Sequence, residues 1–137
     1  MNVSKAKQTS ESIELGVLLA ISGGMMDAYS YMARGKVFAN AQTGNMLLFG
    51  VYLSQGEFAK AMHYFCPIIA FTIGIAMADL VRMTGNKKLH WRQLSVLLEA
   101  IILFAVGFIP MNMNLLANSL TSLACGIQVE SFRKIHG

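Results

Sequence analysis

Five apolar stretches of roughly helical length alternate with short polar segments along this chain. They cover residues 15–33, 37–53, 62–81, 94–109 and about 115–132. A membrane-spanning helix needs about 20 mostly apolar residues, within a range of roughly 17–25. No alternation of apolar and polar residues at period two competes with these stretches. The pattern therefore predicts an all-α, polytopic helical membrane protein with about five membrane segments.

The second stretch is the least regular of the five. It begins with a polar cluster at residues 38–46, FANAQTGNM, and becomes apolar only from Met46. At about 1.5 Å per residue, positions 37–53 extend about 25 Å, which is shorter than a hydrocarbon core of about 30 Å. We therefore expect this segment to be either a broken crossing helix or a re-entrant segment.

Basic residues near the ends of the stretches indicate the orientation, because Lys and Arg accumulate on the cytoplasmic side of a membrane. If all five segments cross, the amino terminus lies outside; if the second segment is re-entrant, it lies inside. Both arrangements divide the 11 basic residues eight to three. Both also place the loop at residues 82–92 and the carboxyl terminus in the cytoplasm.

The composition supports lipid, rather than water, as the main surroundings. Charged residues make up 13% of the chain, whereas a soluble domain averages about 25%. Hydrophobic residues make up 55%, and the mean hydropathy is +0.51. A nucleic-acid partner would require a basic face with stacking aromatic residues, which the sequence does not contain. The lipid bilayer is thus the predicted partner, with residues 1–13 as a polar N-terminal head and residues 14–137 as the membrane domain.

Residues that could bind a metal or another cofactor are scattered along the chain. Cys66 and Cys125 lie inside apolar stretches, where a free cysteine behaves as a small hydrophobic residue. Met111 and Met113 would suit copper, but methionine also fills gaps in irregular cores, and we favour that role. Three histidines have no Cys or carboxylate at ligand spacing: His63, His90 and His136. We expect neither a metal nor a cofactor.

The sequence does not favour an enzyme. Ser22, Ser30 and Ser131 have no histidine in an obvious local arrangement, and no phosphate-binding glycine motif is present. A catalytic triad whose members meet only in space stays open at this point.

Two polar motifs, separated by Phe38, follow one another along the first two stretches: Gly24-Met-Met-Asp27-Ala28 and Gln42-Thr43-Gly44-Asn45. Together with the small residues of the third stretch, Glu99 and Gly126-Ile-Gln128, these motifs resemble the YoaK-like family of small bacterial integral membrane proteins, a domain of unknown function. The resemblance covers nearly the whole chain from about Ile13. It implies a multi-pass protein of the bacterial inner (plasma) membrane.

Members of this family look longer and carry a second Thr-Gly motif beyond the position at which this chain stops. The resemblance therefore implies a chain truncated at its carboxyl-terminal end. A weak internal repeat agrees with this, because residues 24–35 can be laid on residues 126–137 at a constant offset. Val129 departs from the family pattern, which favours asparagine there, and this weakens the case for a polar role of the second copy.

Asp27 stands out because a carboxylate in the middle of a membrane helix costs about 2.5–3.5 kcal/mol and should face protein or water. One hypothesis makes Asp27 a site for a cation, a proton or a substrate amine. The other hypothesis is structural. It gives Asp27 an ion pair with Arg34 or another basic residue, or hydrogen bonds to a backbone unwound at Gly23 and Gly24.

The polar cluster of the second stretch follows Gly35, which is expected to end the first helix. Backbone groups at membrane depth find no hydrogen-bond partners in lipid, so side chains must supply them. We expect Thr43 to cap the next helix and Gly44 to give the backbone conformational freedom. The partners come from four polar residues: Asn40, Gln42, Thr43 and Asn45. A helix that begins here would point its positive end inward, an arrangement that transporters use for anions; alternatively, the cluster only satisfies a bent backbone.

Two further features concern contacts between helices. Glu99 follows Arg92 on roughly the same face of the fourth helix, so it either pairs with a buried cation or extends to the cytoplasmic surface. In the third stretch, small residues at every fourth position predict close contact with another helix: Ala70, Gly74 and Ala78. The spacing also predicts two interfacial ion pairs, Asp79–Arg82 and Glu130–Lys134.

These observations favour a small-solute or ion transporter or channel whose carboxylates and amide-rich helix break line the pathway. The residues of that pathway are Asp27, Asn40, Gln42, Thr43, Asn45 and Glu99, and those of the helix breaks are Gly23, Gly24, Gly35 and Gly44. The alternative is a membrane scaffold or assembly partner whose polar groups only lock helix packing. A homo-oligomer is compatible with either function, and the sequence does not identify the solute.

Overall fold

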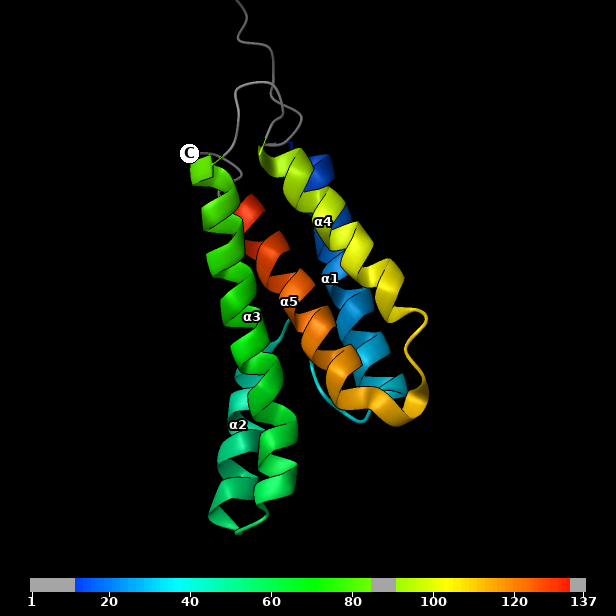
Figure 1. The fold of residues 1–137 in the computed structure, drawn as a ribbon, viewed down its shortest axis with the longest axis vertical. Helices are drawn as coiled ribbons and strands as arrows, with labels where there is room; N and C mark the ends of the chain where they lie inside the picture. Colours follow the sequence, from blue (N-terminus) through cyan, green and yellow to red (C-terminus); the bar gives the residue numbers. More distant parts are fainter. Residues whose placement is uncertain (1–11, 85–90, 134–137) are drawn as a thin grey trace, which may run out of the picture.

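The computed structural model describes residues 12–84 and 91–133 (Figure 1). The α-helices are α1 (Ile13–Ala33), α2 (Gln42–Ser54), α3 (Phe58–Thr84), α4 (Trp91–Val106) and α5 (Asn114–Phe132), with a short 3₁₀ helix, η2 (Met111–Met113), before α5. The described part of the chain contains no strand. The prediction of an all-α fold is therefore confirmed. The predicted polar head lies almost wholly outside the described residues, and its last residue, Ile13, already belongs to α1.

Both ends of α1 have ordinary capping contacts. At its start, the Ser12 hydroxyl oxygen accepts a hydrogen bond from the Leu15 N–H at 3.2 Å. After its last turn, Gly35 has a φ of +91°, a left-handed conformation that suits glycine. The Lys36 N–H then donates back to the Tyr31 carbonyl at 3.2 Å. Gly35 thus ends the first helix, as predicted.

The second segment differs from a crossing helix. Residues 37–41 are not helical, and the 13 residues of α2 extend about 20 Å at about 1.5 Å each. α2 packs against α3 and forms with it a hairpin that extends beyond the neighbouring helix ends (Figure 1). The chain therefore runs from the end of α1 back into the bundle, and α2 leads out of it again.

The remaining boundaries differ from the predicted ones by a few residues. α3 is longer than predicted, and α4 ends at Val106 rather than at residue 109. The chain beyond α4 forms tighter turns, in which the N–H groups of Phe108 and Ile109 donate to carbonyls three residues earlier. These turns accept Pro110, which could not continue the helix.

The long helices alternate in direction, so that their ends gather at two ends of the molecule (Figure 1). The start of α1, the end of α3, the start of α4 and the end of α5 share one end, where Arg82 and Arg133 line the same small pocket. At the other end, the Arg34 guanidinium donates to the carbonyls of Ile109 and Pro110. This grouping of the helix ends is the one expected if the second segment folds back instead of running the length of the bundle.

The central helix is α5, which packs most extensively against α3 and also against α4 and α1. The backbones of α3 and α5 touch at two glycines. A Cβ on Gly74 would lie 2.2 Å from the Leu123 carbonyl oxygen, and a Cβ on Gly126 would lie 2.2 Å from the Phe71 carbonyl oxygen. The predicted close contact through the small residues of α3 is thus confirmed at Gly74.

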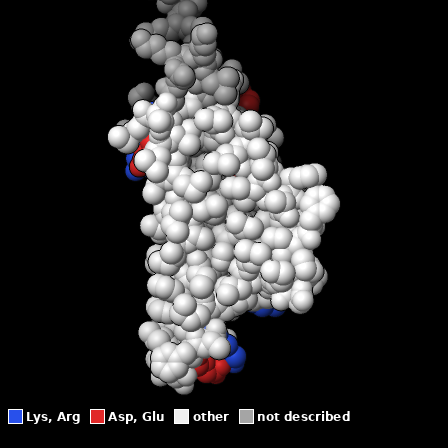
Figure 2. All heavy atoms as spheres, in the orientation of Figure 1, with Lys and Arg blue, Asp and Glu red and all other residues white. Residues whose placement is uncertain are grey.

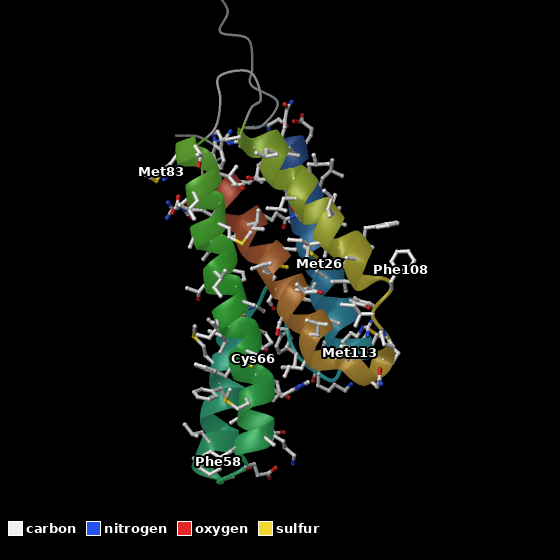
Figure 3. All side chains as sticks on the ribbon, in the orientation of Figure 1. Met26, Phe58, Cys66, Met83, Phe108 and Met113 are labelled. Carbon is white, nitrogen blue, oxygen red and sulfur yellow. The ribbon has the colours of Figure 1, made fainter. Side chains whose placement is uncertain are left out.

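The interior is small, and many large apolar side chains point outward. Met26 lies among the helices in contact with the buried thiol of Cys125, whereas Phe108 points away from them (Figure 3). On the face that Figure 2 shows, charged side chains gather toward the two ends and the band between them is uncharged. Among the described helices, α3 alone is long and apolar enough to cross a membrane, which is weak evidence by itself.

Candidate functional site

The Asp27 carboxylate holds the backbone at the start of α2. Its Oδ1 accepts hydrogen bonds from the N–H groups of Asn40, at 2.7 Å, and Ala41, at 3.3 Å. Ala41 is the N-cap residue of α2 and its own side chain makes no capping bond. A carboxylate from another helix therefore takes the place of a local cap at the positive end of α2.

This geometry corrects two of the predicted partners of Asp27. α1 is a continuous helix through Gly23 and Gly24, so no backbone is unwound there for Asp27 to bind. Arg34 is 3% exposed and binds elsewhere: its guanidinium donates to the Tyr29 hydroxyl at 2.6 Å and to the two carbonyls before η2. Arg34 thus fastens the end of α1 to the α4–α5 connection instead of neutralising Asp27.

Asn45 is the centre of a second polar cluster and is fully buried. Its Oδ1 accepts from the Phe38 N–H at 3.0 Å, and its Nδ2 donates to the Phe38 carbonyl at 2.6 Å and to the Gln42 side-chain oxygen at 2.9 Å. Gln42 in turn donates to the Ala39 carbonyl at 2.7 Å. These bonds support the prediction that the polar cluster satisfies a bent backbone.

Thr43 and Gly44 do not have the predicted roles. Thr43 lies inside α2 with an exposed side chain and does not cap the helix, because α2 begins one residue earlier. Gly44 has no left-handed φ. A larger residue would not fit at this position, because a Cβ there would lie 2.8 Å from the ring of Phe38.

Glu99 is 7% exposed, so it does not extend to the surface. Its Oε1 accepts a hydrogen bond from the side-chain amide of Gln128 on α5 at 2.9 Å. The partner that the structure gives it is thus a neutral amide. Gln128, which was not among the predicted pathway residues, could have been found as an amide inside an apolar stretch.

The side chains of Asn40 and Gln128 both approach α1 at Gly23, where no Cβ is present. A Cβ at this position would lie 3.0 Å from the Asn40 side-chain nitrogen and 4.0 Å from the Gln128 side-chain oxygen. Asn40 and Gln128 also line one cavity of about 240 Å³, whose other walls come from α1 and the last turn of α5. Asp27 accepts a hydrogen bond from the Asn40 backbone N–H, and Glu99 accepts one from the Gln128 side-chain amide.

The structure therefore divides the predicted pathway residues into three groups. Asn40 lines the cavity between α1 and α5, whereas Asp27 and Glu99 do not line it and are each hydrogen-bonded to a residue that does. Gln42 and Asn45 belong to the buried cluster, where the Gln42 amide approaches α5 at 3.4 Å from the Ser122 hydroxyl. The Thr43 side chain lies on the exposed surface of α2.

Other predicted contacts are partly confirmed. Asp79 and Arg82 form the predicted ion pair at 2.8 Å, whereas Glu130 pairs with Arg133 at 3.3 Å. The predicted partner of Glu130, Lys134, lies outside the described residues, as do His90 and His136. Met111 and Met113 are exposed, so the prediction that they fill gaps in the core is wrong.

The fold and the site define a class of helical protein in which a half-length helix begins in the interior, capped by a carboxylate of the first helix. The chain belongs to the family described as "Protein of unknown function (DUF1275)", whose model matches residues 15–137. It is also 27% identical over 128 residues to the UPF0700 transmembrane protein YoaK of Bacillus subtilis (strain 168). That match covers 86% of this chain and 55% of the relative, so the chain spans about half the length of the relative. No solved structure matches the chain.

Asn45→Ala tests the structural role of the buried cluster. The change leaves the Phe38 N–H and carbonyl without partners, and we expect the free energy of unfolding to fall by about 1–3 kcal/mol for each group that stays buried. Thr43→Ala, on the exposed side of the same helix, is the control and should change it by less than about 0.5 kcal/mol. Denaturant unfolding of the purified proteins measures both values. Equal stabilities of the two variants would contradict this role.

Proposed function

We propose that this chain is the membrane-embedded part of a multi-pass protein of the bacterial inner membrane, with a pathway for a small polar solute or ion. The observation that carries the proposal is the cavity of about 240 Å³ between α1 and α5. Its lining includes Asn40 and Gln128, and each is hydrogen-bonded to a carboxylate outside the lining: the Asn40 backbone N–H donates to Asp27, and the Gln128 side-chain amide donates to Glu99. Polar groups of this kind inside a membrane protein usually face a solute pathway or one another.

Three observations support a membrane location. The relative from Bacillus subtilis is named a transmembrane protein. α3 has the length and hydropathy of a membrane helix. Large apolar side chains are exposed along the other helices as well, for example Leu18 on α1 and Phe104 on α4, and water would be a poor solvent for so many.

In the proposed arrangement α1, α3, α4 and α5 cross the membrane, and residues 34–54 re-enter it from the outer side. The cytoplasmic end then carries Arg82, Arg92 and Arg133, together with most of the other basic residues. The outer end carries Arg34, Lys36 and Lys60. The non-helical residues 37–41 lie inside the bundle, where the protein itself supplies the hydrogen bonds that lipid does not.

Single cysteines test this topology in a variant that lacks Cys66 and Cys125. In intact cells, a membrane-impermeant maleimide should label Gln55→Cys, in the turn between α2 and α3. It should label Glu14→Cys only after permeabilisation, because the re-entrant segment keeps the start of α1 inside. Arg133→Cys, which lies inside under either topology, is the control. Labelling of Glu14→Cys in intact cells would contradict the re-entrant arrangement.

The chemistry of the cavity favours a small polar solute that exchanges hydrogen bonds with amide groups. Asn40 and Gln128 offer side-chain amides to such a solute, and the Arg133 guanidinium belongs to the same lining. An anion at the start of α2 is disfavoured, because Asp27 already occupies the two N–H groups there. The cavity extends from Asn40 toward Arg133, that is, toward the proposed cytoplasmic end.

Flux measurements on proteoliposomes test the pathway. Trapped pH-sensitive dye reports protons, and light scattering after osmotic shock reports urea and glycerol. We expect flux of at least one probe above that of empty vesicles, and Glu99→Gln should reduce it by about tenfold or more, equivalent to about 1.4 kcal/mol. Glutamine keeps an oxygen for the Gln128 hydrogen bond, so the fold should persist. Leu97→Ala, on the exposed face of α4, is the matched control.

The scaffold hypothesis has its own supporting observation, which is that the polar atoms of Asn45 are all used in internal bonds. A scaffold predicts no flux of any probe in the wild-type protein. It also predicts that Glu99→Gln changes at most the stability. Absence of flux in vesicles with folded, correctly inserted protein would therefore favour the scaffold and reject the pathway.

A further inference from the structure

A second and larger cavity involves the other part of residues 34–41, the segment that folds back between α1 and α2 and is called here the folded-back segment. It has a volume of about 640 Å³ and is formed by the end of α1, the following turn, α2 and the first turns of α3. It shares no lining residue with the cavity between α1 and α5. Its chemistry comes from six side chains: Tyr31, Tyr52, Tyr64, Lys36, Lys60 and His63.

The aromatic walls of this cavity are fixed by contacts among themselves. The rings of Tyr52 on α2 and Tyr64 on α3 stack at 5.6 Å with an angle of 8° between their planes. Tyr31 stacks on Phe38 at 5.0 Å. The His63 Nε2 lies 3.3 Å from the Gly35 carbonyl oxygen, which fastens α3 to the turn after α1. These contacts hold the rings that line the cavity against neighbouring side chains and the turn after α1.

Two ammonium groups lie over these rings. The Lys36 Nζ is 4.9 Å from the centre of the Tyr31 ring, and the Lys60 Nζ is 5.3 Å from the centre of the Tyr52 ring. Lys60 also pairs with Glu57, which does not line the cavity. Lys36 makes no ion pair with any described residue, so the cavity has a net positive charge.

Lys36 occupies its position at a conformational cost. Its φ is +66°, and it is the one residue other than glycine with a positive φ in the described part of the chain. Such a left-handed conformation is unfavourable for lysine and would suit glycine better. A strained residue that points a charged group at a cavity suggests a functional constraint on the side chain.

We propose that this cavity binds an oxyanion, a carboxylate or a phosphate, attached to an apolar group. The ammonium groups of Lys36 and Lys60 would bind the oxyanion, because charge-assisted hydrogen bonds to cations are the strongest available here. The tyrosine rings and Leu48 would contact the apolar group. The ligand is either a free organic anion or the headgroup of an anionic phospholipid, since Lys60, in the first turn of α3, and Lys36, after the end of α1, both line the cavity.

The site is independent of the proposed solute pathway and is tested by binding alone. Benzoate represents a free organic anion, and short-chain phosphatidylglycerol represents an anionic headgroup. Short-chain phosphatidylcholine, whose headgroup is zwitterionic and has no net charge, is the comparison. Calorimetry on the purified full chain in detergent should detect binding of benzoate or phosphatidylglycerol. Binding of benzoate alone identifies a free anion as the ligand class, and binding of phosphatidylglycerol alone identifies a lipid headgroup.

Lys36→Gly removes the ammonium group and also relieves the strained φ, so the variant should be at least as stable as the wild type. We expect its affinity for the bound probe to fall by about tenfold or more, the effect of losing one charge-assisted hydrogen bond. Arg133→Gln, which removes one charge at the opposite end, should bind as the wild type does. Unchanged affinity of Lys36→Gly, equal binding of phosphatidylcholine, or no binding of either anionic probe would overturn the proposal.

Discussion

The hydrogen bonds from the Asn40 and Ala41 N–H groups to the Asp27 carboxylate determine where the second segment of this protein begins. A chain that turns back into an apolar interior exposes backbone groups that must find partners, at a cost of about 1–3 kcal/mol for each group left without one. Asp27 satisfies two of them at once and places negative charge at the positive end of α2. The position in the interior at which α2 begins therefore depends on the Asp27 side chain of α1.

The rest of the interior is arranged around this point. α5 fills the centre with small and polar residues, and its contact with α3 is close because glycines face backbone carbonyls. The folded-back segment contributes Asn40 to one cavity and Lys36 to the other, so it separates two spaces of different character. One space is lined by the amides of Asn40 and Gln128 together with Arg133, and the other has lysines over tyrosine rings.

Several features of this fold could be predicted from the sequence, because they depend on local patterns. The five apolar stretches gave the helices, and Gly35 marked the end of α1. The partners of Asp27 could not be predicted in the same way, since Ala41 is 14 residues away and comes into reach only when the chain folds back. Arg34 was a reasonable partner for Asp27 by helical spacing, but backbone carbonyls near Pro110 bind it instead.

In the candidate site, too, the polar residues could be found from the sequence, but their contacts could not. Glu99 and Gln128 are both visible in the sequence as polar residues in apolar stretches, yet their contact depends on how α4 packs against α5. The role of Gly23 is likewise a matter of space, because Asn40 and Gln128 approach α1 where a Cβ is absent. Helical periodicity alone contains no information about such contacts.

Site-resolved hydrogen exchange of the Asn40 and Ala41 amides tests the central claim most directly. If the Asp27 carboxylate binds them, both amides are protected in the wild-type protein and lose protection in Asp27→Ala, while the Phe38 amide, which donates to Asn45, stays protected. Rapid exchange of both amides in the wild type, or unchanged protection in Asp27→Ala, would contradict the account.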